Sequence, residues 1–345
     1  MQAVVYHGPG DRRLENVPDP RIEDPNDVIV RVSMSTICGT DLHILRGDVP
    51  TIRPGTVLGH EGVGVVEEAG AAVRRVRKGD RVIVPALSAC GVCKSCKRQM
   101  AFFCENGGGW QVGHLANGLQ AQYARVPLAD TSLHVVPEGL EDVDVLFLTD
   151  SIPTGYECGI ETGRLRPGET LAVVGAGPVG LSAVVTSRLH GPRLVISIDP
   201  DENRLKVARQ LGADHVINPS RQDAREEILR LTDGGVDLAV EAVGVPETFD
   251  LCVALIRGGG RVASLGVHGQ PTTLHLEELW SKIVTITTQT LDGHSIPMLL
   301  DLIRRGKLQP RALATHAFTL ERAMEAYDVF GAAATNKAIK VTIAA

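Results

Sequence analysis

The sequence predicts an α/β protein with two domains, a β-rich domain followed by a doubly wound parallel sheet. The chain has 345 residues, which is too long for one ordinary core. Short β-like stretches broken by Gly and Pro fill residues 1 to about 150. From about residue 168, strands alternate with amphipathic segments of helical length, which is typical of βαβ units. Aromatic residues make up 3%, so aliphatic side chains must fill the cores, as they do between buried parallel strands.

The expected elements can be placed in order along the chain. In the first domain, apolar alternation between turn signals predicts strands at residues 28–32, 62–66 and 81–84. The second domain is expected to contain, in order, a strand at 170–174, a helix at 179–189, a strand at 194–198 and a helix at 202–211 that ends at Gly212. Strands at 236–240, 261–265 and 283–288 and a helix at 297–305 follow. We expect the C-terminal segment to rejoin the first domain.

Composition and charge indicate a globular chain without a polyanionic partner. Hydrophobic residues make up 43% and charged residues 22%, and the net charge of −6 gives no reason to expect binding to nucleic acid or to an anionic membrane. The N-terminus enters strand-like alternation at once, and no export signal is visible. No apolar run approaches the length of about 18 residues needed to span a bilayer. We therefore expect a cytoplasmic protein.

A glycine-rich turn indicates a dinucleotide site. The segment Gly175-Ala176-Gly177-Pro178-Val179-Gly180 follows an expected strand and opens an expected helix. The first Gly makes a tight turn, the second lets the backbone approach a pyrophosphate, and the third lets helix pack on strand. The next strand ends in Asp199, where a carboxylate would bind the adenosine ribose hydroxyls. A plain glycine turn is the alternative, but the two features together favour dinucleotide binding.

Asp199 also favours NAD over NADP, because a carboxylate accepts hydrogen bonds from a free 2′-hydroxyl and repels a 2′-phosphate. Arg204 is a complication, since an arginine could pair with that phosphate. It could equally stack on the adenine edge or face solvent.

Four cysteines, Cys90, Cys93, Cys96 and Cys104, are crowded into fifteen residues. Four thiolates complete a tetrahedral zinc site and leave no position for water, so the expected role of this metal is structural. Two disulfides are the alternative, but a chain without an export signal argues against them. An iron–sulfur cluster is a further alternative, because the spacing alone does not exclude it.

Three further residues that could bind metal, Cys38, His60 and Asp150, are spread along the first domain. Taken singly, each has an ordinary interpretation: a buried thiol, a core histidine and a cap for a following turn. Their joint interpretation depends on a resemblance. Five features share their order along the chain with a known family: residues 39–43, Gly59-His60-Glu61-Gly62, the cysteines at 90–104, Asp150 and the turn at 175–180. With this ordered set, the sequence resembles the medium-chain zinc-dependent alcohol dehydrogenases over essentially its whole length.

The resemblance implies a GroES-like catalytic domain at residues 1–152, completed by 294–345, and a Rossmann NAD-binding domain at 153–293. It implies Cys38, His60 and Asp150 as ligands of a catalytic zinc, with Glu61 as a nearby carboxylate that can replace water on the metal. Asp150 departs from members that have a second cysteine here and is similar to the bacterial secondary-alcohol dehydrogenases. Quinone reductases, which lack zinc, also lack this ligand set.

The implied chemistry is hydride transfer from an alcohol whose oxygen occupies the open zinc position. Thr40 would pass the hydroxyl proton through the nicotinamide ribose to His43, unless these residues form only a turn with a surface imidazole. Trp110 resembles a substrate-pocket residue, together with Thr40. Loops with Val243 and Gly266 end strands at the carboxyl edge of the sheet and could hold the nicotinamide, and Lys340 resembles a late basic residue that reaches the cofactor.

The sequence therefore predicts an NAD-dependent dehydrogenase with two zinc ions per chain, one catalytic and one structural, that converts a small primary or secondary alcohol to an aldehyde or ketone. A polyol, formaldehyde or threonine dehydrogenase would share most of these motifs. A nonenzymatic sensor of zinc and dinucleotide is the alternative from another class. Family resemblance also implies a homodimer or homotetramer, and we expect the apolar edge strand at 283–288 to join the chains.

Overall fold

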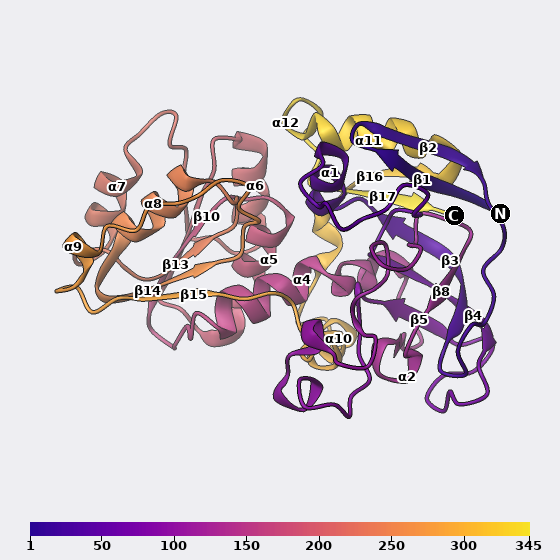
Figure 1. Cartoon of the computed structure of the whole chain (residues 1–345). Coiled ribbons are helices and arrows are strands. Elements are labelled where there is room, and N and C mark those ends of the chain that lie inside the picture. Colours follow the sequence, from indigo (N-terminus) through magenta and orange to yellow (C-terminus); the bar gives the residue numbers. More distant parts are fainter. The chain divides into compact units, whose positions relative to one another are not determined.

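A computed structural model describes all 345 residues of the chain. The chain folds into two compact units (Figure 1). Unit 1 comprises Met1–Asp150 and Asp292–Ala345, and unit 2 comprises Ser151–Leu291. The expected α/β fold class, a GroES-like β-rich part with a Rossmann parallel sheet, is confirmed.

Unit 1 is built mainly of strands. They are β1 (Gln2–Gly8), β2 (Asp11–Asn16), β3 (Val28–Thr36), β4 (Gly62–Ala69), β5 (Arg81–Val84), β6 (Leu87–Ser88), β7 (Gly109–Trp110), β8 (Tyr123–Val126), β9 (His134–Val135), β16 (Ala314–Thr319) and β17 (Lys340–Ala344). Its α-helices are α1 (Gly39–Arg46), α2 (Ala129–Ser132), α3 (Asp142–Val145), α10 (Ile296–Arg304), α11 (Ala323–Gly331) and α12 (Ala333–Asn336). Short 3₁₀ turns are η1 (Cys96–Arg98), η2 (Ala101–Phe103), η3 (Leu146–Thr149), η6 (Pro310–Leu313) and η7 (Leu320–Arg322).

A seven-stranded sheet organises unit 1, in the order β16-β17-β3-β4-β5-β9, with β8 also paired to β3. Strand β17 pairs antiparallel with β3, so the C-terminal segment joins the sheet of the N-terminal part, as expected. One core lies between β1, α1 and the helix α11, and a second lies among β3, β4, β5 and β8. The fully buried side chains of these cores are mainly aliphatic, and their removal from water stabilises the unit.

Unit 2 contains a six-stranded parallel sheet in the order β12-β11-β10-β13-β14-β15. The strands are β10 (Thr170–Val174), β11 (Leu194–Ile198), β12 (His215–Ile217), β13 (Val236–Glu241), β14 (Ile256–Ser264) and β15 (Thr285–Thr288). The helices are α4 (Ser151–Thr154), the π-helix η4 (Gly155–Glu161), α5 (Pro178–Ser187), the 3₁₀ turn η5 (Arg188–His190), α6 (Glu202–Gln210), α7 (Ala224–Leu231), α8 (Pro246–Leu255) and α9 (Leu276–Leu279). The strand order reverses between β10 and β13, which is the switch point where such folds bind ligands.

The expected elements exist, and their differences from the structure lie mostly at the ends. Strands β10 and β11 have the expected bounds, whereas α5 ends in a 3₁₀ turn and β14 begins at Ile256 rather than at Arg261. The strand expected from residue 283 begins at Thr285, because Ile283 has a positive φ of 53° that no strand tolerates. The π-helix and the short helices α7 and α8 were not predicted.

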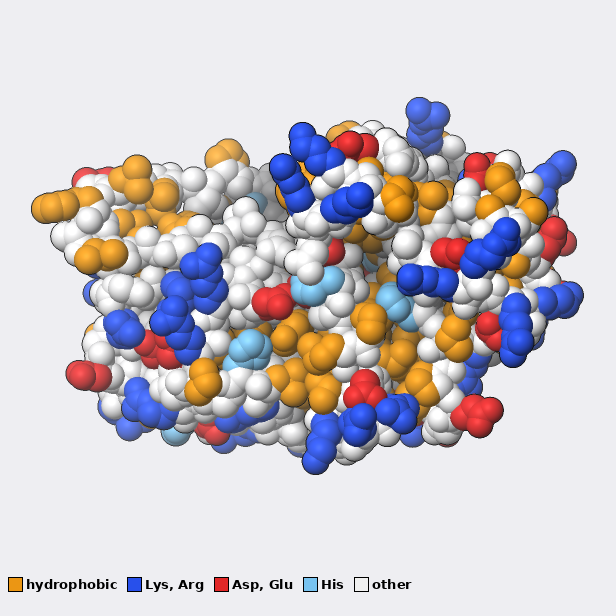
Figure 2. All heavy atoms as spheres, turned by 90° about the horizontal axis from the view of Figure 1, so that it is seen from below, with side chains coloured by type: hydrophobic (Ala, Val, Ile, Leu, Met, Phe, Trp, Pro, Cys, Tyr) orange, Lys and Arg blue, Asp and Glu red, His pale blue; other side chains and the backbone are white.

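None of the helices is long and apolar enough to cross a membrane. Basic and acidic side chains are interspersed over the face shown in Figure 2. No extended field of one sign that would attract a polyanion lies on this face.

Candidate metal centres and cofactor site

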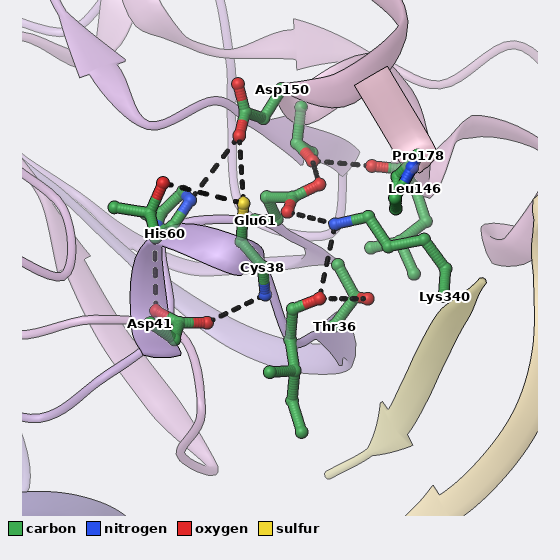
Figure 3. A network of polar contacts seen from close by, with 12 residues as sticks. Thr36, Cys38, Asp41, His60, Glu61, Leu146, Asp150, Pro178 and Lys340 are labelled. Atoms are coloured by element: carbon green, nitrogen blue, oxygen red, sulfur yellow. Dashed lines mark hydrogen bonds and ion pairs between the residues drawn. The ribbon is translucent and has the colours of Figure 1, made fainter. Parts of the chain in front are cut away.

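The structure brings Cys38, His60, Glu61 and Asp150 together in unit 1. One ligand atom from each lies within 4.8 Å of the others. Cys38 occupies the N-cap of α1, His60 and Glu61 directly precede β4, and Asp150 follows η3 (Figure 3). The polypeptide between Glu61 and Asp150 is long, so this group exists only because β3, β4 and η3 pack together.

The contacts within this cluster suit a divalent metal. His60 Nε2 lies 3.4 Å from Asp150 Oδ2, and Cys38 Sγ lies 3.6 Å from the same oxygen. One sulfur, one imidazole nitrogen and carboxylate oxygens are the donor types that zinc accepts. Burial raises the pKa of the Cys38 thiol, and Lys340 opposes that rise. The donor set therefore fits the zinc that the family resemblance implies.

Behind His60 stands Asp41, which is fully buried. His60 Nδ1 and Asp41 Oδ1 lie 3.4 Å apart, and neither atom has a hydrogen-bond partner. Asp41 Oδ2 accepts the backbone N–H of Cys38 at 2.9 Å. Burial lowers the pKa of His60, but Asp41 and Asp150 outweigh it and hold that pKa well above the ordinary value. A metal on Nε2 would leave Nδ1–H to donate to Asp41, an arrangement common in metal sites.

Glu61 forms a buried ion pair with Lys340. Lys340 Nζ donates to Glu61 Oε1 and, at 3.3 Å, to the carbonyl of Ile37, and both side chains are almost fully buried. Burial raises the pKa of Glu61 against the opposing effect of Lys340, whereas Glu61 raises the pKa of Lys340 above its ordinary value. By resemblance, Lys340 is expected to reach the cofactor. The structure instead gives its ammonium a partner inside unit 1.

Thr40 and His43 lie on α1, directly after Cys38. Thr40 Oγ1 is 3.7 Å from Cys38 Sγ, so its hydroxyl borders the cluster. His43 lies farther along the helix, where its Nδ1 is 2.9 Å from Asp48 Oδ2 and 2.8 Å from an Arg46 guanidinium nitrogen. Its side chain is 21% exposed, which permits proton exchange with solvent.

Trp110 lies next to the cluster as well. Its ring meets the His60 ring edge to face at a centroid distance of 5.9 Å, and it stacks on His114 at 4.2 Å. His114 Nε2 is 2.7 Å from Thr51 Oγ1, and its half-buried position lowers its pKa. His114 belongs to the segment whose resemblance to a substrate pocket includes Trp110, whereas a lone Thr in a turn, such as Thr51, carries no signal in the sequence.

The four cysteines of residues 90–104 form a second group, with their sulfur atoms within 4.8 Å of one another. All seven cysteines of the chain are free, so no disulfide joins these four. Backbone N–H groups point at the sulfurs: Cys93 N lies 3.3 Å from Cys90 Sγ, and Cys96 N lies 3.4 Å from Cys93 Sγ. Burial raises the pKa of Cys90, but N–H donors outweigh it and lower that pKa to about 6. These donors favour the thiolate forms of Cys90 and Cys93, and the four sulfurs together fit a closed metal site.

The glycine-rich turn lies between β10 and α5 in unit 2. Gly175 has a φ of 96°, which glycine adopts without strain. A Cβ on Gly180 would lie 1.8 Å from the carbonyl oxygen of Gly175, so only glycine allows this turn to close. Gly177 is the N-cap of α5 and Pro178 and Val179 form its first turn, so the helix N-terminus offers its free N–H groups to a pyrophosphate. This is the geometry of a dinucleotide-binding turn.

Asp199 follows β11, and its carboxylate is tied to the backbone. Oδ2 accepts the N–H of Ala176 at 2.7 Å, and Oδ1 accepts the N–H of Asp201 at 2.8 Å. The nearest guanidinium nitrogen of Arg204 is 3.8 Å from Oδ2. The carboxylate therefore stands beside the glycine-rich turn, with Arg204 held near it.

Glu241 connects the two loops that follow β13 and β14. It is fully buried, and its Oε1 accepts the N–H groups of Val243 and Gly244, both at 2.8 Å. Its Oε2 lies 3.3 Å from His268 Nε2. A Cβ on Gly266 would lie 2.1 Å from the nitrogen of Gly244, so the two loops are in backbone contact. From the sequence, these loops are expected to hold the nicotinamide of the cofactor. The role of the Glu241 carboxylate in joining them is visible only in the structure.

Comparison with known proteins agrees with this geometry. Residues 24–138 match the Alcohol dehydrogenase GroES-like domain family, and residues 178–305 match the Zinc-binding dehydrogenase family. An alcohol dehydrogenase of Cupriavidus necator is 37% identical over 352 residues, which cover 96% of this chain and 95% of the relative.

Two solved structures show the same fold. Zinc dependent alcohol dehydrogenase 2 from Streptococcus pneumonia, in its apo form, has a TM-score of 0.95 and 44% identity, and the match covers 100% of this chain and 98% of that one. A zinc-binding dehydrogenase from Sinorhizobium meliloti 1021, bound to NADP, has a TM-score of 0.90 and 29% identity, with coverage of 100% and 99%. The chain thus belongs to the medium-chain zinc-dependent alcohol dehydrogenase family and is an oxidoreductase.

Proposed function

We propose that this protein oxidises a small primary or secondary alcohol to an aldehyde or ketone, with NAD as hydride acceptor and a catalytic zinc bound by Cys38, His60 and Asp150. The observation that carries the proposal is the cluster in which these three side chains and Glu61 place their ligand atoms within 4.8 Å of one another. Three protein ligands leave one coordination position for a substrate. A separate, closed four-sulfur set at Cys90 to Cys104 would hold the second, structural zinc.

The side chains around the cluster have separate tasks in this proposal. A bound zinc would supply Lewis acidity, which lowers the pKa of an alcohol hydroxyl. Thr40 Oγ1, beside Cys38, would take the hydroxyl proton of the substrate while it gives up its own hydroxyl proton toward His43, and the partly exposed ring of His43 would release a proton to solvent. Trp110 presents an apolar face beside His60, which favours a neutral substrate. Glu61, the fourth member of the cluster, remains paired with Lys340.

Asp199 supports NAD as the cofactor. Its carboxylate stands beside the glycine-rich turn, where it would accept hydrogen bonds from the ribose 2′-hydroxyl and repel a 2′-phosphate. Arg204 is near enough to attract that phosphate, but Asp199 and Asp201 both lie within 4.0 Å of its guanidinium and offset its charge. The loops joined by Glu241 would hold the nicotinamide.

We also propose a homodimer or homotetramer joined through β15, the edge strand of the unit 2 sheet. Apolar side chains are exposed around it: Trp280 is 82% exposed and Ile283 is 81% exposed. Hydrophobic side chains gather at the α9 end of this unit, at the left of Figure 2. An unpaired edge beside exposed apolar residues favours pairing with a second chain.

The proposal is tested with zinc-replete protein, NAD and a panel of primary, secondary and polyhydroxy alcohols, followed by absorbance of the reduced cofactor. We expect turnover with neutral primary or secondary alcohols and two zinc ions per chain by metal analysis. Turnover confined to polyols, formaldehyde adducts or threonine would assign a different substrate class. One zinc per chain and no turnover with any alcohol would refute the catalytic proposal and favour a sensor.

A further inference from the structure

The carboxylate behind His60 has a third partner. Asp41 Oδ2 accepts the backbone N–H of Cys38 at 2.9 Å and the side-chain amide of Gln120 at 3.2 Å. Its other oxygen, Oδ1, faces His60 Nδ1. The exposed fraction is 0% for Asp41 and Gln120 and 3% for His60, so water does not compete for these contacts. Gln120 is therefore part of the support of a residue that the family resemblance makes a metal ligand.

The surroundings of Gln120 determine which way its amide points. Its Nε2 lies 3.2 Å from Asp41 Oδ2 and 3.3 Å from the carbonyl oxygen of Thr36. A carboxylate and a carbonyl can only accept, so the group that faces both must be the NH₂. The amide oxygen then points the other way, where it accepts the hydroxyl of Tyr327 at 2.7 Å. Every donor and acceptor in this chain of contacts has one possible direction.

The hydrogen-bond directions at Gln120 and Asp41 also determine which nitrogen of His60 carries the hydrogen. Both contacts at Asp41 Oδ2 are donors, so Oδ1 is the oxygen left to accept from the imidazole. A hydrogen on Nδ1 then satisfies the two facing atoms that have no other partner. In the neutral imidazole that binds a metal, the lone pair is then on Nε2, which lies on the side of Asp150. The chain from Tyr327 to Asp41 therefore selects the tautomer of His60 that binds a metal through Nε2.

The backbone holds Gln120 in place for this contact. Gly59 has a φ of 92°, and a Cβ there would lie 2.6 Å from Gln120 Cγ, so this glycine makes room for the Gln side chain next to His60. The N–H of Gln120 donates to Leu58 at 2.9 Å. Tyr327 comes from α11, 207 residues later, and the guanidinium of Arg12 lies 4.7 Å from its ring centroid.

We infer that Gln120 and Tyr327 are positioning residues for the metal ligand His60, and that they act through Asp41 by fixing the orientation and tautomer of the imidazole. The inference rests on the proposed function, since it takes His60 as a ligand. Neither residue belongs to the cluster of ligand atoms. Removal of the Tyr327 hydroxyl leaves the buried Gln120 amide oxygen without its donor, so only Asp41 and the Thr36 carbonyl then hold the amide. Removal of the amide leaves Asp41 with the Cys38 N–H as its one remaining donor at Oδ2.

The test uses the full-length protein with Co²⁺ in place of zinc at the cluster and zinc retained by the four cysteines. The variants are Tyr327→Phe and Gln120→Met, which keep the size of each side chain and remove its hydrogen bonds. The control is Thr342→Val, because Thr342 is also buried in unit 1 and loses one hydroxyl bond, to His316 at 3.3 Å, without contact to Gln120. The readouts are the visible absorption of Co²⁺ and the rate of its release to a chelator.

We expect Gln120→Met to raise the release rate about tenfold and Tyr327→Phe to raise it several-fold, with a shifted Co²⁺ spectrum in both, since support of a ligand typically contributes about tenfold or more to metal affinity. Thr342→Val should match the wild type. An unchanged release rate and spectrum in both variants would overturn the inference while the proposed function stands. A wild-type chain that takes up no Co²⁺ at the cluster would overturn the proposed function itself, and this inference with it.

Discussion

At the scale of single residues, the cluster owes its chemistry to three ligands that differ in type. Cys38 supplies sulfur, His60 nitrogen and Asp150 oxygen, and all three meet within the distance that one metal ion spans. A metal bound by three protein groups is sensitive to each of them, because loss of one leaves two, too few for a stable site.

We expect Cys38→Ser and Asp150→Asn each to lose the catalytic zinc and at least about a thousandfold in kcat, because the Lewis acid disappears with the ligand. Metal analysis should fall from two zinc ions per chain to one. A Cys104→Ser variant serves as the control, since it should release the structural metal instead. Normal turnover in Cys38→Ser or Asp150→Asn would remove that residue from the ligand set.

Asp199 controls the choice of cofactor in our proposal. We expect Asp199→Ala to raise kcat/KM with NADP relative to NAD by about tenfold or more, because the repulsion of the 2′-phosphate is lost while Arg204 remains. The ratio of the two kcat/KM values is the measurement, and each variant is its own control for general loss of binding. Equal use of both cofactors by the wild type would contradict the assignment.

His134 lies on the edge strand β9, and the burial of its ring makes the stability of the protein depend on pH in the acid range. Burial, with Arg75 nearby, lowers the pKa of His134 to about 4 from 6.5. Between these two pH values the unfolded chain binds more protons than the folded chain. The free energy of unfolding therefore falls by about 3 kcal/mol as the pH drops from 6.5 to 4. We expect His134→Gln to show a smaller fall in Tm across this interval than the wild type. Parallel curves for both proteins would show that His134 does not titrate as described.

At the scale of elements, helix N-termini and strand ends position the functional groups. Cys38 is the N-cap of α1, and the glycine-rich turn leads into α5. These junctions place side chains or free N–H groups at the end of a rigid element, which is more precise than placement on a long loop. The π-helix η4, which directly follows α4, is an element that local sequence patterns do not predict.

The junction of β10 and α5 tolerates no side chain at its third glycine. Because a Cβ on Gly180 would lie 1.8 Å from the Gly175 oxygen, we expect Gly180→Ala to push helix from strand and to weaken NADH binding at least about tenfold. NADH fluorescence titration measures the loss. Gly168→Ala provides a control, since no atom lies within 4 Å of that Cβ and both positions are in unit 2, although its positive φ adds some strain. Equal affinity in Gly180→Ala and the wild type would mean that this turn does not bind the cofactor.

At the scale of the whole molecule, the two compact units divide the proposed chemistry. Unit 1 contains the cluster around Cys38 and His60 and also the group of four cysteines. Unit 2 contains the glycine-rich turn with Asp199. Apolar residues are exposed around β15, and in our proposal they mark the place where a second chain would pair.

We expect Trp280→Lys to shift the protein from oligomer to monomer, because an ammonium would be buried without a partner at the proposed interface. Leu115→Lys is the matched control, since Leu115 is a large apolar residue that is 64% exposed and lies in the other unit. Light scattering after size separation measures the mass of both variants. A wild type that is monomeric at micromolar concentration, or an oligomer unaffected by Trp280→Lys, would contradict this interface.

Much of the fold and part of the site can be predicted from sequence, because they depend on residues close together in the chain. The parallel strands β10 and β11 follow from apolar periodicity, and the glycine turn and the four cysteines are short-range patterns whose spacing already implies their geometry. The grouping of Cys38, His60 and Asp150 was expected from family resemblance, since nothing in their separate surroundings requires them to meet.

Only the tertiary structure decided which distant residues support that group. Asp41 meets Gln120 across 79 residues, Gln120 meets Tyr327 across 207, and Lys340 meets Glu61 across 279. Such contacts arise from the pairing of β17 with β3 and the packing of α11 on the same core, and sheet register and packing are long-range properties. The residues near one another in sequence determined the chemistry that is available. The fold determined which of them a metal ion would meet and what holds each ligand in place.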